Sequence, residues 1–464
     1  MARLSRSLVK GWAHLGTRFL PFADAASPDV PLSRLLRLSL FQVSCGMAMV
    51  LLMGTLNRVM IVELHVPAAL VAVMVSLPIV FAPLRALIGY RSDTYRSALG
   101  WKRVPFIWRG SLIQFGGFAV MPFALLVLAG AGQSAHYAPW VGQVAAGIAF
   151  LLVGAGVHTV QTVGLALATD LVPEEDQPKV VGLMYVMLLV GMMLSAMVFG
   201  ILLIDYSPGQ LVRVIQGAAV VTLVLNVVAM WKQEARDPDR HKPRPPASDV
   251  DFQDAWAVFR RGPDALRRLL IVGLGTAAFS MEDVLLEPYG GEILSMSVSD
   301  TTLLTATLSA GGLCGFWLAS VVLGRGYDAF RMATIGAVTG LPAFTLVIAA
   351  APLGSPVWFG AGVLLIGFGA GLFGHGTLTA TMRAAPRDQI GLALGAWGAV
   401  QATAAGVAVG LGGILRDAYA AASEPVLGYV FVYSLELFLL VLTITVMAPL
   451  AGWRRGLATR NQAA

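Results

Sequence analysis

The sequence contains too few charged residues for a soluble protein of its length. Only 12% of its 464 residues are charged and 57% are hydrophobic, whereas a typical soluble domain carries about 25% charged residues. A globule of this size could not cover its surface with polar side chains. The composition therefore excludes a soluble domain and indicates that lipid surrounds most of the chain.

Cysteine is scarce, and the common catalytic motifs are absent. Cys45 and Cys314 both lie in apolar runs, so we expect neither a disulfide nor a protein-bound metal. The sequence has no G-x-x-x-x-G-K-S/T phosphate loop, no C-x-x-C pair and no H-E-x-x-H motif. We therefore expect a protein that is not an enzyme.

Long apolar runs are what the sequence has in abundance. A helix of roughly 20 apolar residues crosses the hydrocarbon core of a bilayer. Proline, glycine and charged residues separate twelve runs of suitable length. They lie at residues 35–57, 67–90, 104–130, 140–169, 178–204, 211–231, 268–293, 302–323, 332–352, 357–382, 388–415 and 427–450. The sequence therefore predicts an all-α polytopic membrane protein with twelve transmembrane helices.

The distribution of positive charge predicts the orientation of the chain. With the N-terminus in the cytoplasm, all but three of the 32 lysine and arginine residues fall on the cytoplasmic side, in accord with the positive-inside rule. The three exceptions are Arg58, Arg213 and Arg416. We therefore expect both termini in the cytoplasm. The net charge of +6 follows from this arrangement and does not indicate a nucleic-acid partner.

A polar stretch divides the chain into two six-helix halves. Residues 232–267 are rich in proline and charge, as is typical of a cytoplasmic linker. The expected order is a cytoplasmic segment at 1–33, a six-helix bundle at 34–231, the linker, a second six-helix bundle at 268–450, and a cytoplasmic tail at 451–464.

The two halves repeat three motifs at equivalent helix ends. A G-x-x-x-D-x-x-R pattern, a Pro-to-Gln loop and a Gly-to-Asp helix end occur in the same order in each half. Their positions are 89–96 and 324–331, 173–177 and 386–389, and 200–205 and 412–417. Because each half has an even number of helices, the repeat predicts parallel halves related by a pseudo-two-fold axis along the membrane normal.

The paired loop motifs resemble those of the major facilitator superfamily. More specific strings resemble its bacteriochlorophyll-delivery family, the PucC/LhaA-type light-harvesting assembly proteins of purple bacteria. These strings are LSLFQVS at 38–44, GTLNRVMIVEL at 54–64, FAPLRALIG at 81–89, SALGWKRVP at 97–105 and LLEPYGG at 285–291. Only the termini and the linker fall outside the resemblance.

The resemblance implies a function in photosynthetic membranes. The protein is expected to bind bacteriochlorophyll and to deliver it to nascent antenna polypeptides in the bacterial inner, intracytoplasmic photosynthetic membrane. The implied partners are antenna polypeptides, the reaction-centre/light-harvesting complex, the pigment and lipid. The family pattern also implies that the loop motifs form a conformational latch, in which aspartate meets a helix end and arginines. The matching residues are Gly89, Asp93, Arg96 and Arg103 in the first copy, and Gly324, Asp328 and Arg331 in the second.

Three carboxyl groups interrupt the seventh span. Glu282, Asp283 and Glu287 lie within six residues of an otherwise apolar helix, close to Tyr289. A charged carboxyl exposed to lipid at the bilayer centre costs at least ~2.5 kcal/mol. One interpretation is a site that faces a pigment groove or central cavity, where a carboxylate such as Glu282 ligates the Mg²⁺ of the pigment. The other is a structural role, either pairing with Arg58 or capping a broken helix.

The first span offers a polar group in the equivalent helix of the other half. Asn57 and Arg58 precede Glu63 near its outer end. We expect Arg58 to form an ion pair with Glu282 or Asp283, because such a pair would neutralise both charges.

Two histidines within spans are further candidates for pigment binding. His158 lies with Gln161 on the fourth span, and His375 lies on the tenth. Neutral imidazole can ligate the metal of a tetrapyrrole, and neighbouring glycines would let a flat macrocycle approach the backbone. The alternative interpretation is close helix packing with hydrogen bonds across the bundle.

Two other functions fit the same residues. A secondary transporter would couple a small solute to protons through the acidic residues of the seventh span. A structural partner would associate with an antenna ring without carrying pigment. Copurified pigment, proton-driven uptake and pigment-free binding to antenna polypeptides distinguish the three.

Overall fold

Helices form every regular element among the described residues. The computed structural model describes residues 22–27, 29–78, 88–89, 91–92, 95, 100–130, 134, 136–173, 176–235, 264–384 and 390–451. Eleven helices in these ranges are long and apolar enough to cross a membrane, which confirms eleven of the predicted spans. The remaining span, predicted at 67–90, begins with α5 (Ala68–Ser76), and residues 79–87 lie outside the described ranges.

The first span, Leu32–Glu63, is one helix whose winding changes along its length. It contains α2 (Leu32–Leu38), α3 (Leu40–Met49), η2 (Val50–Thr55), α4 (Leu56–Arg58) and η3 (Val59–Glu63). Both η2 and η3 are π-helical, a rare geometry that is frequent at functional sites. Side chains five residues apart therefore share a face in these two segments.

Contacts divide the chain into two compact units. The first contains Met1–Met49, Pro83–Ser195 and Pro208–Pro243, and the second contains Val50–Ala82, Ala196–Ser207 and Arg244–Ala464. The second unit therefore includes two segments that precede the linker. The six-plus-six division of the sequence stays a prediction, and residues 1–21 and 236–263 of its N-terminal segment and linker lie outside the described ranges.

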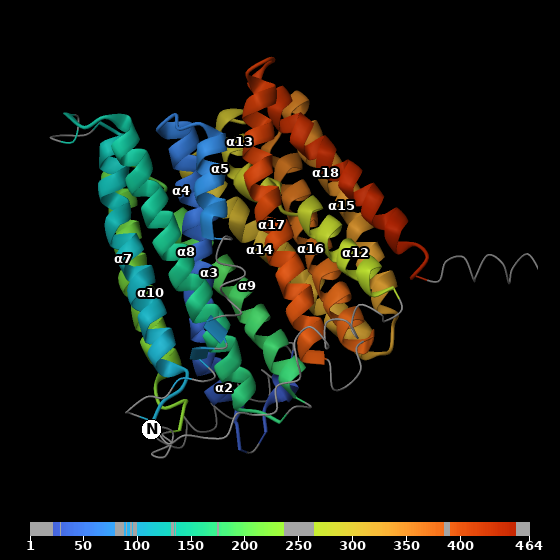
Figure 1. Cartoon of the computed structure of the whole chain (residues 1–464). Coiled ribbons are helices and arrows are strands. Elements are labelled where there is room, and N and C mark those ends of the chain that lie inside the picture. The colour runs from blue at the N-terminus through green and yellow to red at the C-terminus, as the bar shows by residue number, and fades with distance from the viewer. Residues whose placement is uncertain are drawn as a thin grey trace, which may run out of the picture. The chain divides into compact units, whose positions relative to one another are not determined.

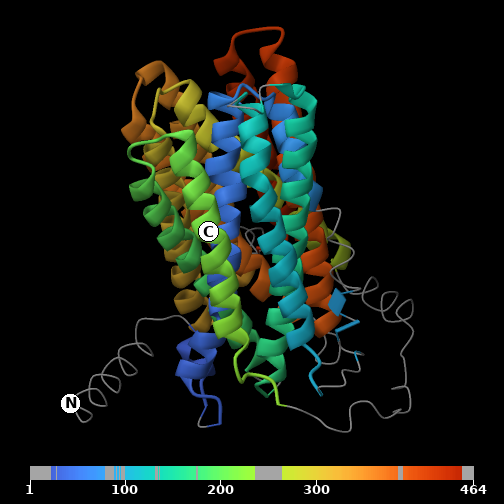
Figure 2. The same cartoon turned by 90° about the vertical axis from the view of Figure 1, so that its left-hand side faces the viewer.

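The first unit is built from long helices that approach closely. Besides α2 and α3 it contains α7 (Val104–Leu128), α8 (Pro139–Asp170), most of α9 (Gln177–Leu202) and α10 (Pro208–Met230). Helix α7 packs on α8 and α10 (Figure 1), and α10 runs beside α3 (Figure 2). A Cβ at Gly117 would meet the α8 backbone, and one at Gly156 would meet the α7 backbone, so glycine permits this contact.

The second unit contains the helices that follow the linker. They are α12 (Ala265–Ala278), η6 (Glu282–Val284), α13 (Leu286–Glu292), α14 (Val298–Gly324), α15 (Ala329–Leu353), α16 (Pro356–Ala384), α17 (Ile390–Ala420) and α18 (Pro425–Met447). Helix α16 packs on both α14 and α15, and α17 packs on α5. Gly311 of α14 and Gly367 of α16 each lie against the backbone of the facing helix.

Candidate functional site

The seventh span is broken at its acidic segment. Helix α12 ends at Ala278, and the Phe279 backbone N–H donates to the Gly275 carbonyl at 3.2 Å. The chain then turns through η6 and resumes as α13. Pro288 is the third residue of α13, a first-turn position where a missing N–H is tolerated. The proline therefore belongs to the start of a new helix, and the acidic residues lie at the break.

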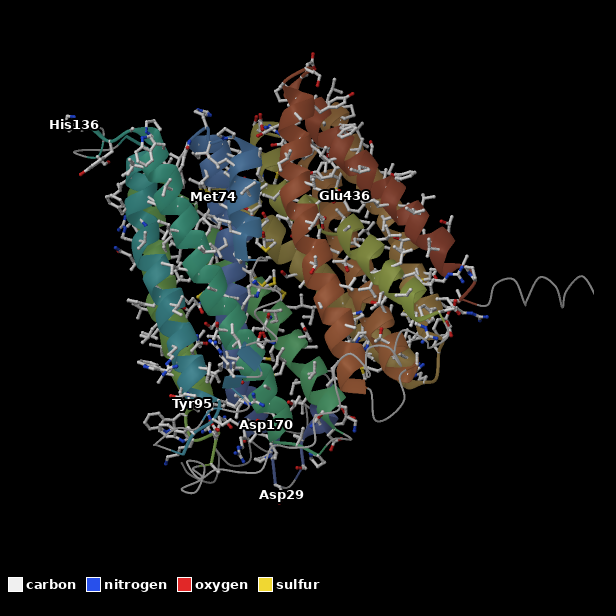
Figure 3. The ribbon with its side chains drawn as sticks, viewed as in Figure 1. Asp29, Met74, Tyr95, His136, Asp170 and Glu436 are labelled. Atoms are coloured by element: carbon white, nitrogen blue, oxygen red, sulfur yellow. The ribbon has the colours of Figure 1, made fainter. Side chains whose placement is uncertain are left out.

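Glu436 of α18 reaches into this break. Its Oε1 atom accepts a hydrogen bond of 2.8 Å from the backbone N–H of Glu282. The exposed fractions are 1% for Glu282 and 0% for Glu436, so both carboxyl groups are inside the second unit. Figure 3 labels Glu436 on its helix. Glu436 was not among the residues predicted from the sequence, although a single acid in an apolar span is itself a signal for a functional or structural role.

Glu287 is buried beside the first span. The Thr305 hydroxyl donates to Glu287 Oε1 at 2.5 Å, and the charge of Arg58 also acts on this carboxyl group. A Cβ at Gly54 would collide with the same oxygen, so glycine makes the approach possible. The exposed fraction of Glu287 is 3%, whereas Asp283 is partly exposed. The structure therefore places two of the three predicted carboxyl groups in the interior.

Asn57 joins the first span to the break. Its Nδ2 atom donates to the Val284 carbonyl at 2.8 Å and to the Met53 carbonyl at 3.0 Å. Asn57 is fully buried. Asn57 therefore contacts the acidic segment through a backbone carbonyl of η6, a contact that was not predicted from the sequence.

The predicted ion pair of Arg58 with Glu282 or Asp283 is wrong. Arg58 Nη1 lies 2.5 Å from Glu63 Oε1, and Nη2 donates to the Met296 carbonyl at 3.1 Å. The π-helical winding of η3 explains the difference, because residues five apart come to the same face. Local geometry therefore supplies Arg58 with a partner from its own helix.

Tyr289 packs among aromatic side chains. It is fully buried, and its hydroxyl donates to the Val347 carbonyl at 3.1 Å. Its ring centroid lies 5.2 Å from those of Phe359 and Tyr429 and 5.5 Å from that of Tyr433. Pigment or substrate binding by Tyr289 stays a prediction.

A cluster of charged side chains around Arg416 connects α5, α13, α17 and α18. Arg416 forms ion pairs with Glu292 and with Asp417, the latter at 2.7 Å, and lies 4.5 Å over the Tyr429 ring. Asp417 Oδ2 accepts a hydrogen bond of 2.7 Å from the Ala69 N–H at the start of α5. The signal in the sequence was the repeated Gly-to-Asp helix end, which contains Asp417.

The two histidines differ in exposure. His158 is partly exposed on α8, and Gln161, three residues later, donates to Gln42 at 3.4 Å. His375 is only 7% exposed, and its ring centroid lies 4.3 Å from that of Phe316. His158 is therefore the more accessible of the two.

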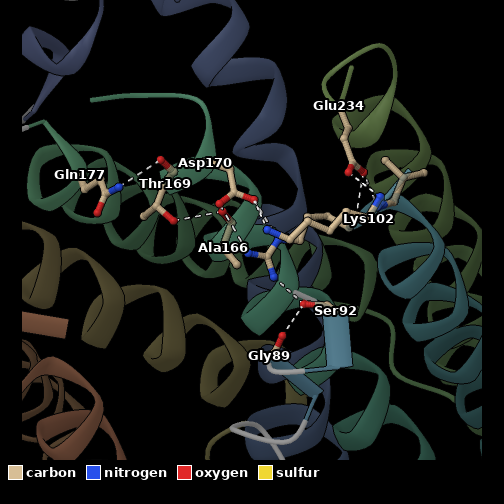
Figure 4. A network of polar contacts seen from close by, with 10 residues as sticks. Gly89, Ser92, Lys102, Ala166, Thr169, Asp170, Gln177 and Glu234 are labelled. Atoms are coloured by element: carbon tan, nitrogen blue, oxygen red, sulfur yellow. Dashed lines mark hydrogen bonds and ion pairs between the residues drawn. The ribbon is translucent and has the colours of Figure 1, made fainter. Parts of the chain in front are cut away.

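A polar network holds the loop end of the first unit together (Figure 4). Arg103, which is 4% exposed, donates to Asp170 at 2.9 Å and to the Ser92 hydroxyl at 2.5 Å. Ser92 in turn donates to the Gly89 carbonyl at 2.8 Å. Figure 3 shows Asp170 at one end of this unit and His136 at the other. Asp93 and Arg96 lie outside the described residues, so their latch role stays a prediction.

Glu234, which was not among the residues predicted from the sequence, completes this network. Its two carboxylate oxygens accept hydrogen bonds from three consecutive backbone N–H groups at the start of α7. These belong to Lys102 at 2.5 Å, Arg103 at 2.9 Å and Val104 at 3.0 Å. An anion at this position satisfies the free donors of a helix N-terminus and complements its dipole.

The second copy of the loop motif caps its own helix. Asp328 Oδ1 accepts a hydrogen bond of 2.7 Å from the Arg331 N–H at the start of α15. The Arg331 guanidinium donates to the Ala451 carbonyl at 3.0 Å. Gly324 is the last residue of α14. Asp328 therefore caps the helix that it precedes, and among the described residues no ion pair joins the Asp328 and Arg331 side chains.

Known proteins resemble the chain over most of its length. A family model described as PUCC protein matches residues 55–454. "Protein PucC" of Rhodovulum sulfidophilum is 62% identical over 90% of this chain and 92% of that protein. "Protein PucC" of Cereibacter sphaeroides is 57% identical over 99% of this chain and 100% of that protein. The "Bacteriochlorophyll synthase 44.5 kDa chain" of Rhodobacter capsulatus is 26% identical over 80% of this chain and 85% of that protein.

Solved structures establish the fold. The crystal structure of a D-xylose–proton symporter has a TM-score of 0.68 at 15% sequence identity and covers 89% of this chain and 96% of its own. At that identity the likeness concerns the fold alone. Together with the membrane-spanning helices, it confirms the predicted all-α polytopic fold of major-facilitator type.

Proposed function

Because the chain belongs to the PucC family, we propose that it is an assembly factor of bacterial light-harvesting complexes. It binds bacteriochlorophyll and delivers it to nascent antenna polypeptides. The observation that carries this proposal is the 57% identity to a PucC protein over the full length of both chains. The more distant Rhodobacter capsulatus relative adds support, because it is named as a chain of bacteriochlorophyll synthase.

His158 is the residue best suited to ligate the pigment. The Mg²⁺ of a tetrapyrrole accepts an axial ligand, and imidazole can supply it. His158 is partly exposed, and Gln161 lies three residues later on the same helical face. To ligate a macrocycle, His375 would first have to lose its packing on Phe316. Glu282 would first have to separate from Glu436.

The test compares bound pigment among variants purified by gentle solubilisation. His158→Ala should lower bacteriochlorophyll per protein more than His375→Ala does. His136→Ala is the matched control, because this histidine lies exposed in the turn before α8 and should leave pigment unchanged. Equal pigment in all three variants would contradict ligation by His158. Binding to antenna polypeptides without any pigment would instead support the structural-partner function.

Proton-coupled transport of a small solute is the second candidate. The observation in its favour is the set of buried carboxyl groups of Glu282, Glu287 and Glu436. The two functions differ in their response at Glu287. If the carboxyl contacts pigment, Glu287→Gln keeps an oxygen and should lower pigment less than Glu287→Ala. If the carboxyl carries a transported proton, both changes should abolish solute uptake equally, because an amide cannot titrate.

We place the protein in the inner, intracytoplasmic photosynthetic membrane with both termini in the cytoplasm. The charge asymmetry of the loops supports this orientation. Reporter fusions after Arg96, within residues 240–246 and after Arg455 should report the cytoplasm. Fusions near Ala135 and Ser355 should report the periplasm, and a reversal at any of these sites would contradict the orientation.

A further inference from the structure

The carboxyl groups of Glu282 and Glu436 interact directly at the break of the seventh span. Besides the hydrogen bond from the Glu282 backbone, the two side chains act on each other. The other titratable groups that act on this pair are Asp283 on η6 and Tyr433 on α18. All of these groups are acids. The pair is therefore a concentration of potential negative charge in the interior of the second unit.

Cations on the neighbouring elements are engaged elsewhere. Among the described residues, no ion pair joins Glu282 or Glu436 to a lysine, arginine or histidine. The cations of the elements around the pair have these partners: Arg58 with Glu63, Arg416 with Glu292 and Asp417, Arg267 with Asp264, Arg268 with the Phe330 ring, and Arg331 with the Ala451 carbonyl. A basic side chain therefore does not neutralise the pair.

Three buried polar atoms point to a ligand at this place. Glu282 Oε2, Glu436 Oε2 and the Tyr433 hydroxyl are all buried and have no hydrogen-bond partner among the described residues. Tyr433 and Glu436 are three residues apart on α18 and so lie on one face of it. No group of three or more metal-ligating side chains in the described ranges could hold a metal ion. The ligand that suits two adjoining carboxyl groups is a proton.

We infer that Glu282 and Glu436 form a proton-binding site and share one proton. Two carboxylates in contact, without a cation and away from water, cannot both stay ionised. A proton held between them removes one charge and lets one carboxyl group donate a hydrogen bond to the other. Such a pair titrates as a unit. The proton site lies within the second unit and does not depend on pigment binding.

The position of the site couples the proton to the fold. Glu436 accepts a hydrogen bond from the backbone N–H of Glu282. The same carboxyl group therefore holds the proton and links η6 to α18. Loss of the proton places two negative charges side by side and drives the segment that contains η6 and α13 away from α18. The bound proton therefore keeps the broken helix docked.

Infrared spectroscopy of the purified full-length protein tests for the proton. At neutral pH the wild type should show the carbonyl stretch of protonated carboxyl groups. The double variant Glu282→Gln/Glu436→Gln should lose the intensity of one such group. Glu424→Gln is the control, because Glu424 lies exposed at the start of α18 and its side chain makes no capping hydrogen bond. An unchanged band in the double variant would overturn the inference.

Melting of the single variants provides a second measurement that does not require the double variant to fold. Glutamine at 436 can accept the Glu282 N–H and donate to the Glu282 carboxylate, as a protonated glutamate would. The melting temperature of the wild type should fall as pH rises above the ordinary carboxyl range, because the unfolded chain then releases a proton that the native pair keeps. Glu436→Gln should be less sensitive to alkaline pH. The inference would be overturned if the melting temperatures of both proteins fell equally with pH. It would also be overturned if the wild-type melting temperature depended on sodium concentration and not on pH.

Discussion

The loop end of the first unit and the broken helix of the second unit treat buried charge in opposite ways. In the first unit, Asp170 has Arg103 as a partner, and Glu234 accepts backbone donors of a helix start. In the second unit, Glu282 and Glu436 adjoin each other without a basic partner among the described residues. Charges of opposite sign hold a structure together, whereas adjoining acids need a ligand. The difference separates a structural network from a candidate binding site.

Loss of Arg103 should produce the largest effect. Arg103→Ala removes the donor to Asp170 and to Ser92, and the free energy of unfolding should fall by about 2 kcal/mol. This value is below that of a fully buried pair because the Asp170 side chain is 40% exposed. Thermal melting in detergent measures the change.

A surface ion pair provides the control for Arg103. Lys179 is 42% exposed on its side chain and pairs with Asp176, so Lys179→Ala should change stability by less than about 0.5 kcal/mol. Equal losses in the two variants would mean that burial of Arg103 contributes nothing.

A double-mutant cycle at Arg58 should give the next largest effect. Arg58→Ala and Glu63→Ala should be non-additive by about 1 kcal/mol, because each change removes the same ion pair. Arg58→Ala and Glu282→Gln should be nearly additive. Coupling of Arg58 to Glu282 in place of Glu63 would restore the ion pair that the sequence suggested and would remove the contrast between the two regions.

Substitution of Asp328 should lower stability by the amount typical of a lost helix cap. Asp328→Ala should destabilise the protein by about 1 kcal/mol because the Arg331 N–H loses its acceptor. Asp328→Asn should have a smaller effect, since asparagine also caps helices.

In cells, Asp93→Asn should weaken antenna assembly more than Asp328→Asn, because the first loop contains more cations. Equal and total loss at both positions would argue against separate roles.

Neutralising Glu287 should have the smallest effect on stability. Glu287→Gln retains an oxygen that accepts the Thr305 hydroxyl, so the free energy of unfolding should change by less than about 0.5 kcal/mol. Asp170→Asn, the matched change in the first unit, should be more harmful because it removes the charge that pairs with Arg103. A larger loss of thermal stability in Glu287→Gln than in Asp170→Asn would contradict the proposed difference between the two regions.

Hydropathy was sufficient to predict eleven of the spans, and the paired loop motifs indicated a fold of major-facilitator type. Runs of apolar residues located eleven helices, because a bilayer admits few other backbone structures. The sequence also signalled the break of the seventh span through its acids and the proline that follows. The exact partners were harder to predict, since they depend on helix winding and on contacts between distant segments.

Arg58 and Glu436 illustrate this limit. Arg58 pairs with a residue five positions later because η3 is π-helical, and the apolar pattern contains no signal for that winding. Glu436 lies 154 positions from Glu282, whose backbone N–H donates a hydrogen bond to it. An acid in an apolar span was a signal in the sequence, but the placement of Glu436 beside the break is visible only in the fold.

An absorbance spectrum of the purified protein tests whether it binds pigment. The wild-type protein is expressed in a strain that makes bacteriochlorophyll but lacks antenna polypeptides, and is purified after gentle solubilisation. Bacteriochlorophyll should copurify with the protein, and the absorbance should fall in His158→Ala but not in His136→Ala. A wild-type protein that is folded and free of pigment under these conditions would contradict pigment binding.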